Sequence, residues 1–145
     1  MAYESPRWGT EQGSGPSGPR AGFGLRMAGW LIDALILNII AVVVRNGAGG
    51  AGNLVDTLVG IAYIVGFIGS PRGQTPGMMV TRIRVVSISD GGPIGYLRST
   101  ARWLASIVSA LALLIGYFWM LWDREKQTWH DKAAQSVVVP AYAAT

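Results

Sequence analysis

One arginine and two aspartates are the residues whose types and positions could do chemistry in this chain. Arg26 and Asp33 lie inside an apolar segment, Leu25 to Val44, and Asp131 lies far along the chain in a polar segment. A charge in a segment long enough to cross a bilayer is costly unless it is paired or neutralised. Asp33 could therefore be a proton or cation site, or it could fix helix packing through hydrogen bonds between helices.

The spacing of Arg26 and Asp33 places both on one face of a helix. Seven residues of helix separate them by about 10 Å along the axis, which is too far for a direct ion pair but within reach of a shared network. Arg26, near the helix end, can extend its side chain to the interface, whereas Asp33 cannot. We predict a polar network of Arg26, Asp33 and Asp131, with His130, Asp56, Gln74 and Thr75 as supporting residues.

The composition indicates a membrane protein. Of the 145 residues, 50% are hydrophobic and 14% are charged, and the mean hydropathy is +0.35. Such a chain lacks the polar residues that cover the surface of a soluble domain. We predict an all-α membrane protein, a small transmembrane bundle of about three apolar helices at residues 25–44, 54–70 and 103–122. The third segment carries aromatic residues at both ends, as helices do where they meet lipid headgroups.

The flanking segments are predicted to differ from this bundle. Residues 1–22 are rich in Gly, Pro and Ser and are expected to form a disordered tail, the membrane domain covers 23–140, and 141–145 form a short tail. Residues 81–89 and 136–139 are rich in β-branched side chains. Because a single strand leaves its backbone groups unpaired, we expect these two segments to pair as a short two-stranded sheet outside the bilayer.

The residues around the third apolar segment allow more than one interpretation. Arg98 and Arg102, four residues apart, fall on one helical face, which fits either a segment in the headgroup layer or a plain cytoplasmic helix end. Within the segment, small residues recur at helical spacing and suit close packing against another helix, within or between subunits. This stripe consists of Ala105, Ser109, Ala112 and Gly116.

The basic residues suggest an orientation but conflict with three full crossings. Of the twelve Lys and Arg residues, only Arg45 lies in the glycine-rich connection between the first two apolar segments. Because basic residues favour the cytoplasmic side, we expect this connection on the external side of the membrane and the N-terminus in the cytoplasm. Three crossings would leave the basic C-terminal segment outside and would separate the two predicted strands. A third segment that enters and returns would avoid both problems, although its length suits a full crossing. We take three crossings as the working prediction.

Several function classes are disfavoured. The chain has no Cys, and the neighbouring His130 and Asp131 lack an evident nucleophile or metal-ligand spacing, so we expect no enzyme, cofactor or metal site. Gly47, Gly49 and Gly52 match a dinucleotide-binding pattern only by letter, because a predicted membrane helix precedes them instead of a strand. The net charge of +4 comes from scattered residues, which favours contact with anionic lipid headgroups over binding of nucleic acid.

Several ordered motifs resemble the RDD family of small membrane proteins, named for one arginine and two aspartates. They cover about residues 22–140. One departure is Met78, where members usually carry Lys. The motifs are RMAGWLIDALIL with Arg26 and Asp33, GQTPG at residues 73–77, RIRVV, DGG, LRSTARWL, and QTWHDKAAQSVVV with Asp131.

The resemblance implies a multi-pass protein of the bacterial plasma membrane and links Asp131 to Arg26 and Asp33 as the family trio. Transport of unidentified ligands has been suggested for the family, with sodium/proton exchange for some members. We expect a non-catalytic accessory component of a larger membrane complex or a homo-oligomer, because about sixty apolar membrane residues can barely enclose a pathway alone. The alternative is an ion or small-solute transporter that uses Asp33.

Overall fold

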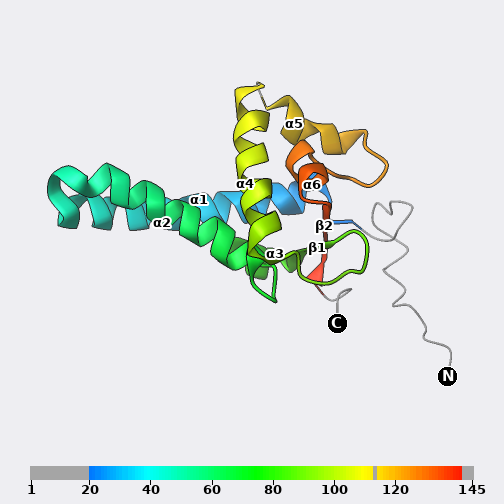
Figure 1. Cartoon of the computed structure of the whole chain (residues 1–145), viewed down its shortest axis with the longest axis horizontal. Coiled ribbons are helices and arrows are strands. Elements are labelled where there is room, and N and C mark those ends of the chain that lie inside the picture. The colour runs from blue at the N-terminus through cyan, green and yellow to red at the C-terminus, as the bar shows by residue number, and fades with distance from the viewer. Residues whose placement is uncertain (1–19, 113, 142–145) are drawn as a thin grey trace.

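The computed structural model describes residues 20–112 and 114–141 and is mostly helical (Figure 1). A long helical hairpin projects from a body that contains shorter helices and a two-stranded sheet. The elements in chain order are α1 (Phe23–Ala48), η1 (Gly49–Ala51), α2 (Gly52–Gly69), α3 (Pro76–Thr81), β1 (Ile83–Ser87), α4 (Gly95–Leu111), α5 (Ile115–Phe118), η2 (Trp119–Leu121), α6 (Trp129–Ala133) and β2 (Ser136–Pro140).

Helices α1 and α2 form the hairpin. The chain turns at η1, where Gly49 has a φ of 56° and an added Cβ at Gly52 would lie 2.9 Å from the Cα of Arg45. Glycine is therefore required where the two helices approach at the turn. The stretch from Phe23 to Gly69 is long and apolar enough to cross a membrane, with a mean hydropathy of 2.3 over its most apolar part.

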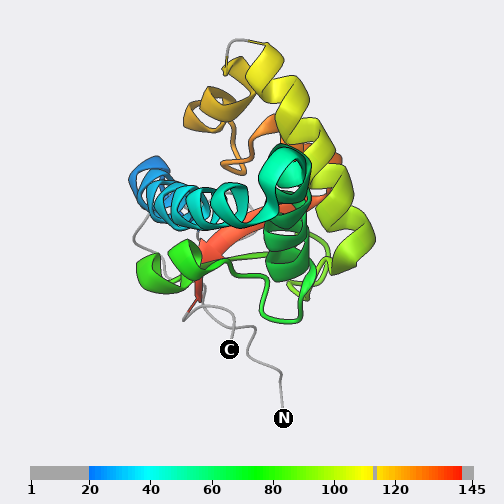
Figure 2. The same ribbon diagram turned by 90° about the vertical axis from the view of Figure 1, so that its left-hand side faces the viewer.

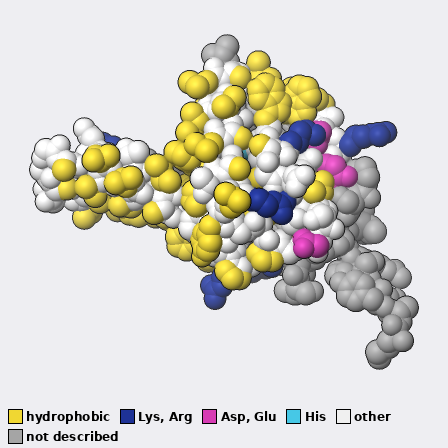
Figure 3. Space-filling view, viewed as in Figure 1, with side chains coloured by type: hydrophobic (Ala, Val, Ile, Leu, Met, Phe, Trp, Pro, Cys, Tyr) yellow, Lys and Arg dark blue, Asp and Glu magenta, His cyan; other side chains and the backbone are white. Residues whose placement is uncertain are grey.

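Large apolar side chains cover the outside of the hairpin, as Figure 3 shows. Exposure of this much contiguous apolar surface is unusual in a protein surrounded by water and fits a helix pair surrounded by lipid. The exposed side chains on α1 and α2 include Trp30, Leu31, Leu35, Ile39, Val42, Val43, Leu54 and Leu58.

Residues 103–122 do not form the single apolar helix that the sequence predicts. Helix α4 begins at Gly95 and ends at Leu111, and the chain then bends by 112° into α5 and η2. Leu114 has a φ of 65°, and its N–H donates to the carbonyl of Ser109 at 3.1 Å. Small residues allow this return, because a Cβ at Gly116 would lie 2.4 Å from the Ser109 hydroxyl. These two stripe residues therefore pack against each other within the chain.

The prediction that residues 81–89 and 136–139 pair is confirmed. Strands β1 and β2 are antiparallel, with Val85 opposite Val138 and Ser87 opposite Ser136. In Figure 2, β2 crosses behind the hairpin helices. One face of the sheet packs in the main apolar core, which consists of Ala21, Ile68, Ile83, Val85, Ile94 and Val138.

Residues 1–19 and 142–145, which include most of the predicted tails, lie outside the described part of the chain. The described structure already includes Arg20 and Ala21, within the predicted N-terminal tail. Ala21 is 1% exposed, and its N–H donates to the carbonyl of Val138 at 2.9 Å. The N-terminal side of α1 is thus attached to the sheet.

Candidate functional site

Asp131 is positioned by the short helix α6. Thr128 precedes this helix and accepts a hydrogen bond from the Asp131 N–H at 3.3 Å, while the Asp131 carboxylate accepts one from the Thr128 N–H at 3.0 Å. This reciprocal pair is a capping box, a motif that satisfies backbone donors at a helix start. The Asp131 side chain is 0% exposed. A fully buried carboxylate requires partners.

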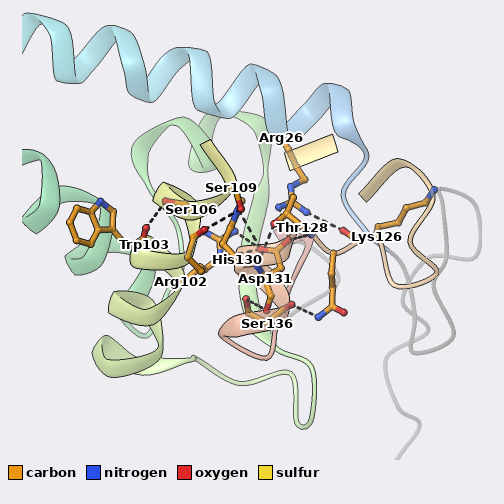
Figure 4. Close-up of polar contacts among 12 residues, drawn as sticks. Arg26, Arg102, Trp103, Ser106, Ser109, Lys126, Thr128, His130, Asp131 and Ser136 are labelled. Atoms are coloured by element: carbon orange, nitrogen blue, oxygen red, sulfur yellow. Dashed lines mark hydrogen bonds and ion pairs between the residues drawn. The ribbon is translucent and has the colours of Figure 1, made fainter. Parts of the chain in front are cut away.

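Two arginines from different helices pair with the Asp131 carboxylate (Figure 4). Arg26, in the first turn of α1, donates from Nη2 to Oδ2 at 2.6 Å, and Arg102, in α4, donates from Nη2 to Oδ1 at 2.6 Å. Arg26 also donates to the carbonyl of Lys126 at 3.1 Å. The carboxylate therefore joins α1, α4 and α6 at one point. We name Arg26, Arg102 and Asp131 the arginine–aspartate cluster.

The charges of this cluster determine the protonation state of Asp131. Burial alone raises the pKa of its carboxyl group, but the guanidinium charges of Arg26 and Arg102 lower it by more. The net result is a pKa far below the ordinary value, so Asp131 is ionised at physiological pH. An ionised carboxylate with two cationic partners stabilises the packing of the helices and has no free proton to exchange.

His130 lies next to the cluster and is 5% exposed. Its ring contacts that of Tyr117, with the centroids 4.9 Å apart. Within the described residues, its Nδ1 atom has no hydrogen-bond partner. Burial, together with the positive charges of Arg102 and Arg26, lowers the pKa of His130 to about 3 despite the opposing effect of Asp131. The imidazole is therefore neutral at physiological pH.

We expect acidification to destabilise the fold through His130. An unfolded chain binds a proton at the ordinary His pKa of 6.5, whereas the folded chain binds it only near pH 3. Stability should therefore fall as the pH decreases from about 6.5 toward 3. Thermal unfolding in detergent between pH 7.5 and 4.5 measures this slope. His130→Phe, which retains the ring contact with Tyr117, should make the slope shallower, and an unchanged slope would contradict the assignment.

Asp33 belongs to a separate cluster at the base of the hairpin. Asp33 is 5% exposed, and its carboxylate accepts hydrogen bonds from the Tyr63 hydroxyl and the Gly77 N–H, each at 2.8 Å, and from the Thr75 hydroxyl at 2.5 Å. These donors come from α2 and from the segment at the start of α3. Asp33 therefore connects three parts of the chain, as Asp131 does elsewhere.

The structure divides the predicted network of Arg26, Asp33 and Asp131 into two. Arg26 and Asp131 are in direct contact, whereas Asp33 shares no hydrogen-bond partner with either among the described residues. Arg26 and Asp33 lie two turns apart along α1, about 10 Å, and each side chain reaches only a few ångströms. Each charge therefore contacts a different set of partners.

The other predicted residues have different positions. Thr75 donates to Asp33, and His130 lies beside the arginine–aspartate cluster. Asp56 pairs with Arg45 at the hairpin turn, at 2.7 Å, away from both clusters. Gln74 donates to the carbonyl of Ile83 at 2.9 Å and so orients the segment before β1. No group of three or more His, Asp or Glu suited to a metal ion occurs among residues 20–112 and 114–141.

Sequence analysis missed three partners as site residues. Arg102 shares a face with Arg98, but it is 8% exposed and directed at Asp131, whereas Arg98 donates to the carbonyl of Ala134 at 2.7 Å. Tyr63 follows Asp56 by seven residues and so lies on the same face of the predicted second helix, and this spacing is a signal that could have marked it. Gly77 donates through its backbone, and only its place in the GQTPG motif marked it.

Comparison with known proteins identifies the family. A sequence profile of the RDD family matches residues 20–135. Proline-rich antigen homologs from Mycobacterium tuberculosis strains CDC 1551 / Oshkosh and H37Rv are each 37% identical over 95 residues, which is 61% of this chain and 40% of theirs. The proline-rich antigen of Mycobacterium leprae strain TN is 36% identical over 86 residues, 57% of this chain and 34% of its own.

The match therefore spans less than half the length of these curated relatives. No solved structure matches the chain. The profile match includes the hairpin with Arg26 and Asp33, the GQTPG motif whose residues donate to Asp33, and Asp131. The chain belongs to the RDD family, whose members are small membrane proteins.

Proposed function

We propose that this RDD-family membrane protein is a non-catalytic component of the bacterial plasma membrane, acting as an accessory subunit of a larger complex or as a small homo-oligomer. The observation that carries the proposal is that the carboxylates of Asp33 and Asp131 are both occupied by donors from other parts of the chain. Groups that bind a ligand or transfer a proton need a free face, whereas these two connect helices.

The apolar surface supports association with other membrane components. Leu97 is 86% exposed on α4, in addition to the apolar side chains of the hairpin. In a membrane, such side chains contact lipid or the helices of a partner. A chain of 15.4 kDa with one apolar hairpin has little internal volume for a pathway of its own. Association is therefore the role that the surface suits.

The polar surface supports contact with the cytoplasmic leaflet. The body, from which both ends of the hairpin emerge, carries four exposed basic residues: Arg72, Arg82, Arg124 and Lys132. Exposed Lys and Arg next to a membrane segment attract anionic lipid headgroups, and their excess over the single Arg45 at the hairpin turn favours a cytoplasmic body and N-terminus. We therefore include a multi-pass topology with a cytoplasmic N-terminus in the proposal.

The proposal predicts an assembly larger than one chain. Protein extracted in mild detergent and measured by light scattering, with the detergent mass subtracted, should give at least twice the 15.4 kDa of the chain. Purification from the native membrane at low detergent should retain the same assembly or a stoichiometric membrane partner. A stable monomer under both conditions would contradict the proposal.

The second candidate, cation or proton transport through Asp33, rests on the position of this carboxylate between α1 and α2. The Tyr63 and Thr75 hydroxyls that donate to it could also accept a proton or coordinate a cation. Proteoliposomes that contain a pH-sensitive dye separate the two functions. A flux that the Asp33→Asn variant abolishes, while this variant elutes like the wild type, would favour transport over the accessory role.

A further inference from the structure

Three segments that are distant in the sequence are in hydrogen-bond contact in the body. The segment before α1 contacts β2, because the Ala21 N–H donates to the Val138 carbonyl. The segment after α2 contains β1, which pairs with β2 along its full length. Arg26 at the start of α1 pairs with Asp131, which follows the third apolar region. A hydrocarbon core of about 30 Å cannot lie between groups in hydrogen-bond contact.

These contacts limit how many times the chain can cross the membrane. The chain leaves the body along α1 and returns along α2, so the hairpin begins and ends on one side of the membrane. It leaves the body again along α4, and β2 returns to pair with β1. If the body lies on one side, the third apolar region must also begin and end on that side.

The third apolar region has the shape of a segment that enters and returns. The part of α4 beyond Arg102 contains nine residues, which at 1.5 Å per residue extend about 14 Å, or half of the hydrocarbon core. The chain then bends by 112° and runs back through α5 and η2. Both ends are attached to the body, by Arg102 with Asp131 on one side and by Asp123 with Lys132, at 2.8 Å, on the other.

Large apolar side chains on both arms of the bend are exposed, although Phe118 on the returning arm also stacks on Phe23, with the ring centroids 5.6 Å apart. Nine of them, on the α4 arm and on the returning arm, are exposed by 40% or more, and Figure 3 shows groups of hydrophobic side chains over α4 and α5. They are Leu104, Ile107, Val108 and Leu111 on α4, and Leu114, Ile115, Phe118, Leu121 and Trp122 on the returning arm.

The backbone at the bend is also suited to hydrocarbon. Non-helical backbone is tolerated at membrane depth only where its polar groups are paired. The Ala112 N–H donates to the Val108 carbonyl, the Leu114 N–H to that of Ser109, and the Ile115 N–H to that of Ala112. These three donors are therefore satisfied inside the chain.

We propose that α4, α5 and η2 form a re-entrant element that inserts into the leaflet next to the body, with lipid acyl chains as the occupants of its apolar surface. The hairpin α1–α2 is then the one part of the described chain that reaches the opposite face. This inference concerns only the surface that contacts lipid, and it applies to an accessory subunit and to a transporter alike. A result that overturns the re-entrant element therefore leaves the proposed function standing, and the reverse is also true.

The absence of Cys in the chain permits a direct test by single-cysteine labelling. Variants Gly50→Cys at the hairpin turn, Arg72→Cys before the element and Arg124→Cys after it are exposed in the structure. A membrane-impermeant maleimide applied to intact cells and to permeabilised cells should label the last two in the same way and Gly50→Cys in the opposite way. Leu111→Cys, at the bend, should remain unlabelled in both, because a thiol in hydrocarbon forms no thiolate.

Two results would overturn the proposal. One is labelling of Arg124→Cys on the same side as Gly50→Cys, which would indicate a full crossing. The other is labelling of Leu111→Cys together with Gly50→Cys. As an independent measurement, Val86→Cys combined with Val137→Cys, opposite each other in the sheet, should form a disulfide in native membranes on oxidation. Val86→Cys combined with Gly50→Cys is the matched pair that should form none.

Discussion

Asp131→Asn is expected to lower the free energy of unfolding by about 3–5 kcal/mol, because it leaves two buried guanidinium groups without a counter-charge. Arg26 and Arg102 are 12% and 10% exposed at their side chains, and both donate to this one carboxylate. An amide of the same size still accepts one hydrogen bond but carries no charge, so the repulsion between the two arginines is no longer offset. Chemical denaturation in detergent micelles, followed by tryptophan fluorescence, measures the loss.

Asp56→Asn is the matched control for this prediction. Asp56 also pairs with an arginine at 2.7 Å, but the Arg45 side chain is 57% exposed, so the loss should be about 0–1 kcal/mol. Equal losses at the two positions would show that burial of the cluster is unimportant. Replacing the whole cluster, with Arg26→Met, Arg102→Met and Asp131→Leu together, should recover part of the stability lost in Asp131→Asn, because no buried charge then remains.

The sequence predicted the members of this cluster unequally. Arg26 and Asp131 are 105 residues apart, and no periodicity connects positions so distant. Only the family resemblance joined them, and it offered no partner list. Arg102 was visible as a basic residue at the start of an apolar segment, which is also the pattern of a residue at the headgroup layer. The choice between solvent and a buried carboxylate depends on tertiary packing.

The two-stranded sheet was more accessible to sequence analysis than the bend. Residues 81–89 have β-branched side chains and partial alternation, and this local pattern survives in β1. The bend after Leu111 interrupts a segment with no charge and no proline, so hydropathy alone indicated a straight helix. Ser109 and Gly116 were recognised as small residues, but a small-residue stripe fits a neighbouring helix and a folded-back chain equally well.

Two of the sequence-based expectations, the strand pairing and three full crossings, were incompatible with each other. Pairing of β1 with β2 and three straight crossings cannot coexist, because the strands would lie on opposite sides of the bilayer. The structure keeps the pairing and breaks the third apolar region. Five paired residues and a buried ion pair provide specific contacts, whereas a straight apolar helix gains no such contact from its length alone.

Gly77→Ala is expected to destabilise the fold by about 3 kcal/mol or more, through the Asp33 cluster. An added Cβ would lie 2.1 Å from the Gly29 carbonyl oxygen and 2.8 Å from the Asp33 carboxylate carbon, so α1 and the start of α3 must separate. Overpacking of this kind costs about 1–3 kcal/mol, and breaking the hydrogen bond from the Gly77 N–H to the Asp33 carboxylate adds about 1–3 kcal/mol, because a buried donor is left unpaired.

Gly60→Ala is the control, because Gly60 is inside α2 and an added Cβ has nothing within 4 Å. That variant should be as stable as the wild type or more stable by up to about 1 kcal/mol, since alanine favours helix. The same denaturation measurement applies to both variants.

A double-mutant cycle identifies the contact that Gly77→Ala disrupts. Asp33→Asn also weakens the bonds from Thr75, Tyr63 and Gly77, so the two substitutions act on the same contacts. Their combined cost should be smaller than the sum of the single costs, because a contact that is already broken cannot be lost again. Strict additivity would mean that Gly77 acts only through its approach to Gly29, and that the Asp33 carboxylate does not stabilise the start of α3.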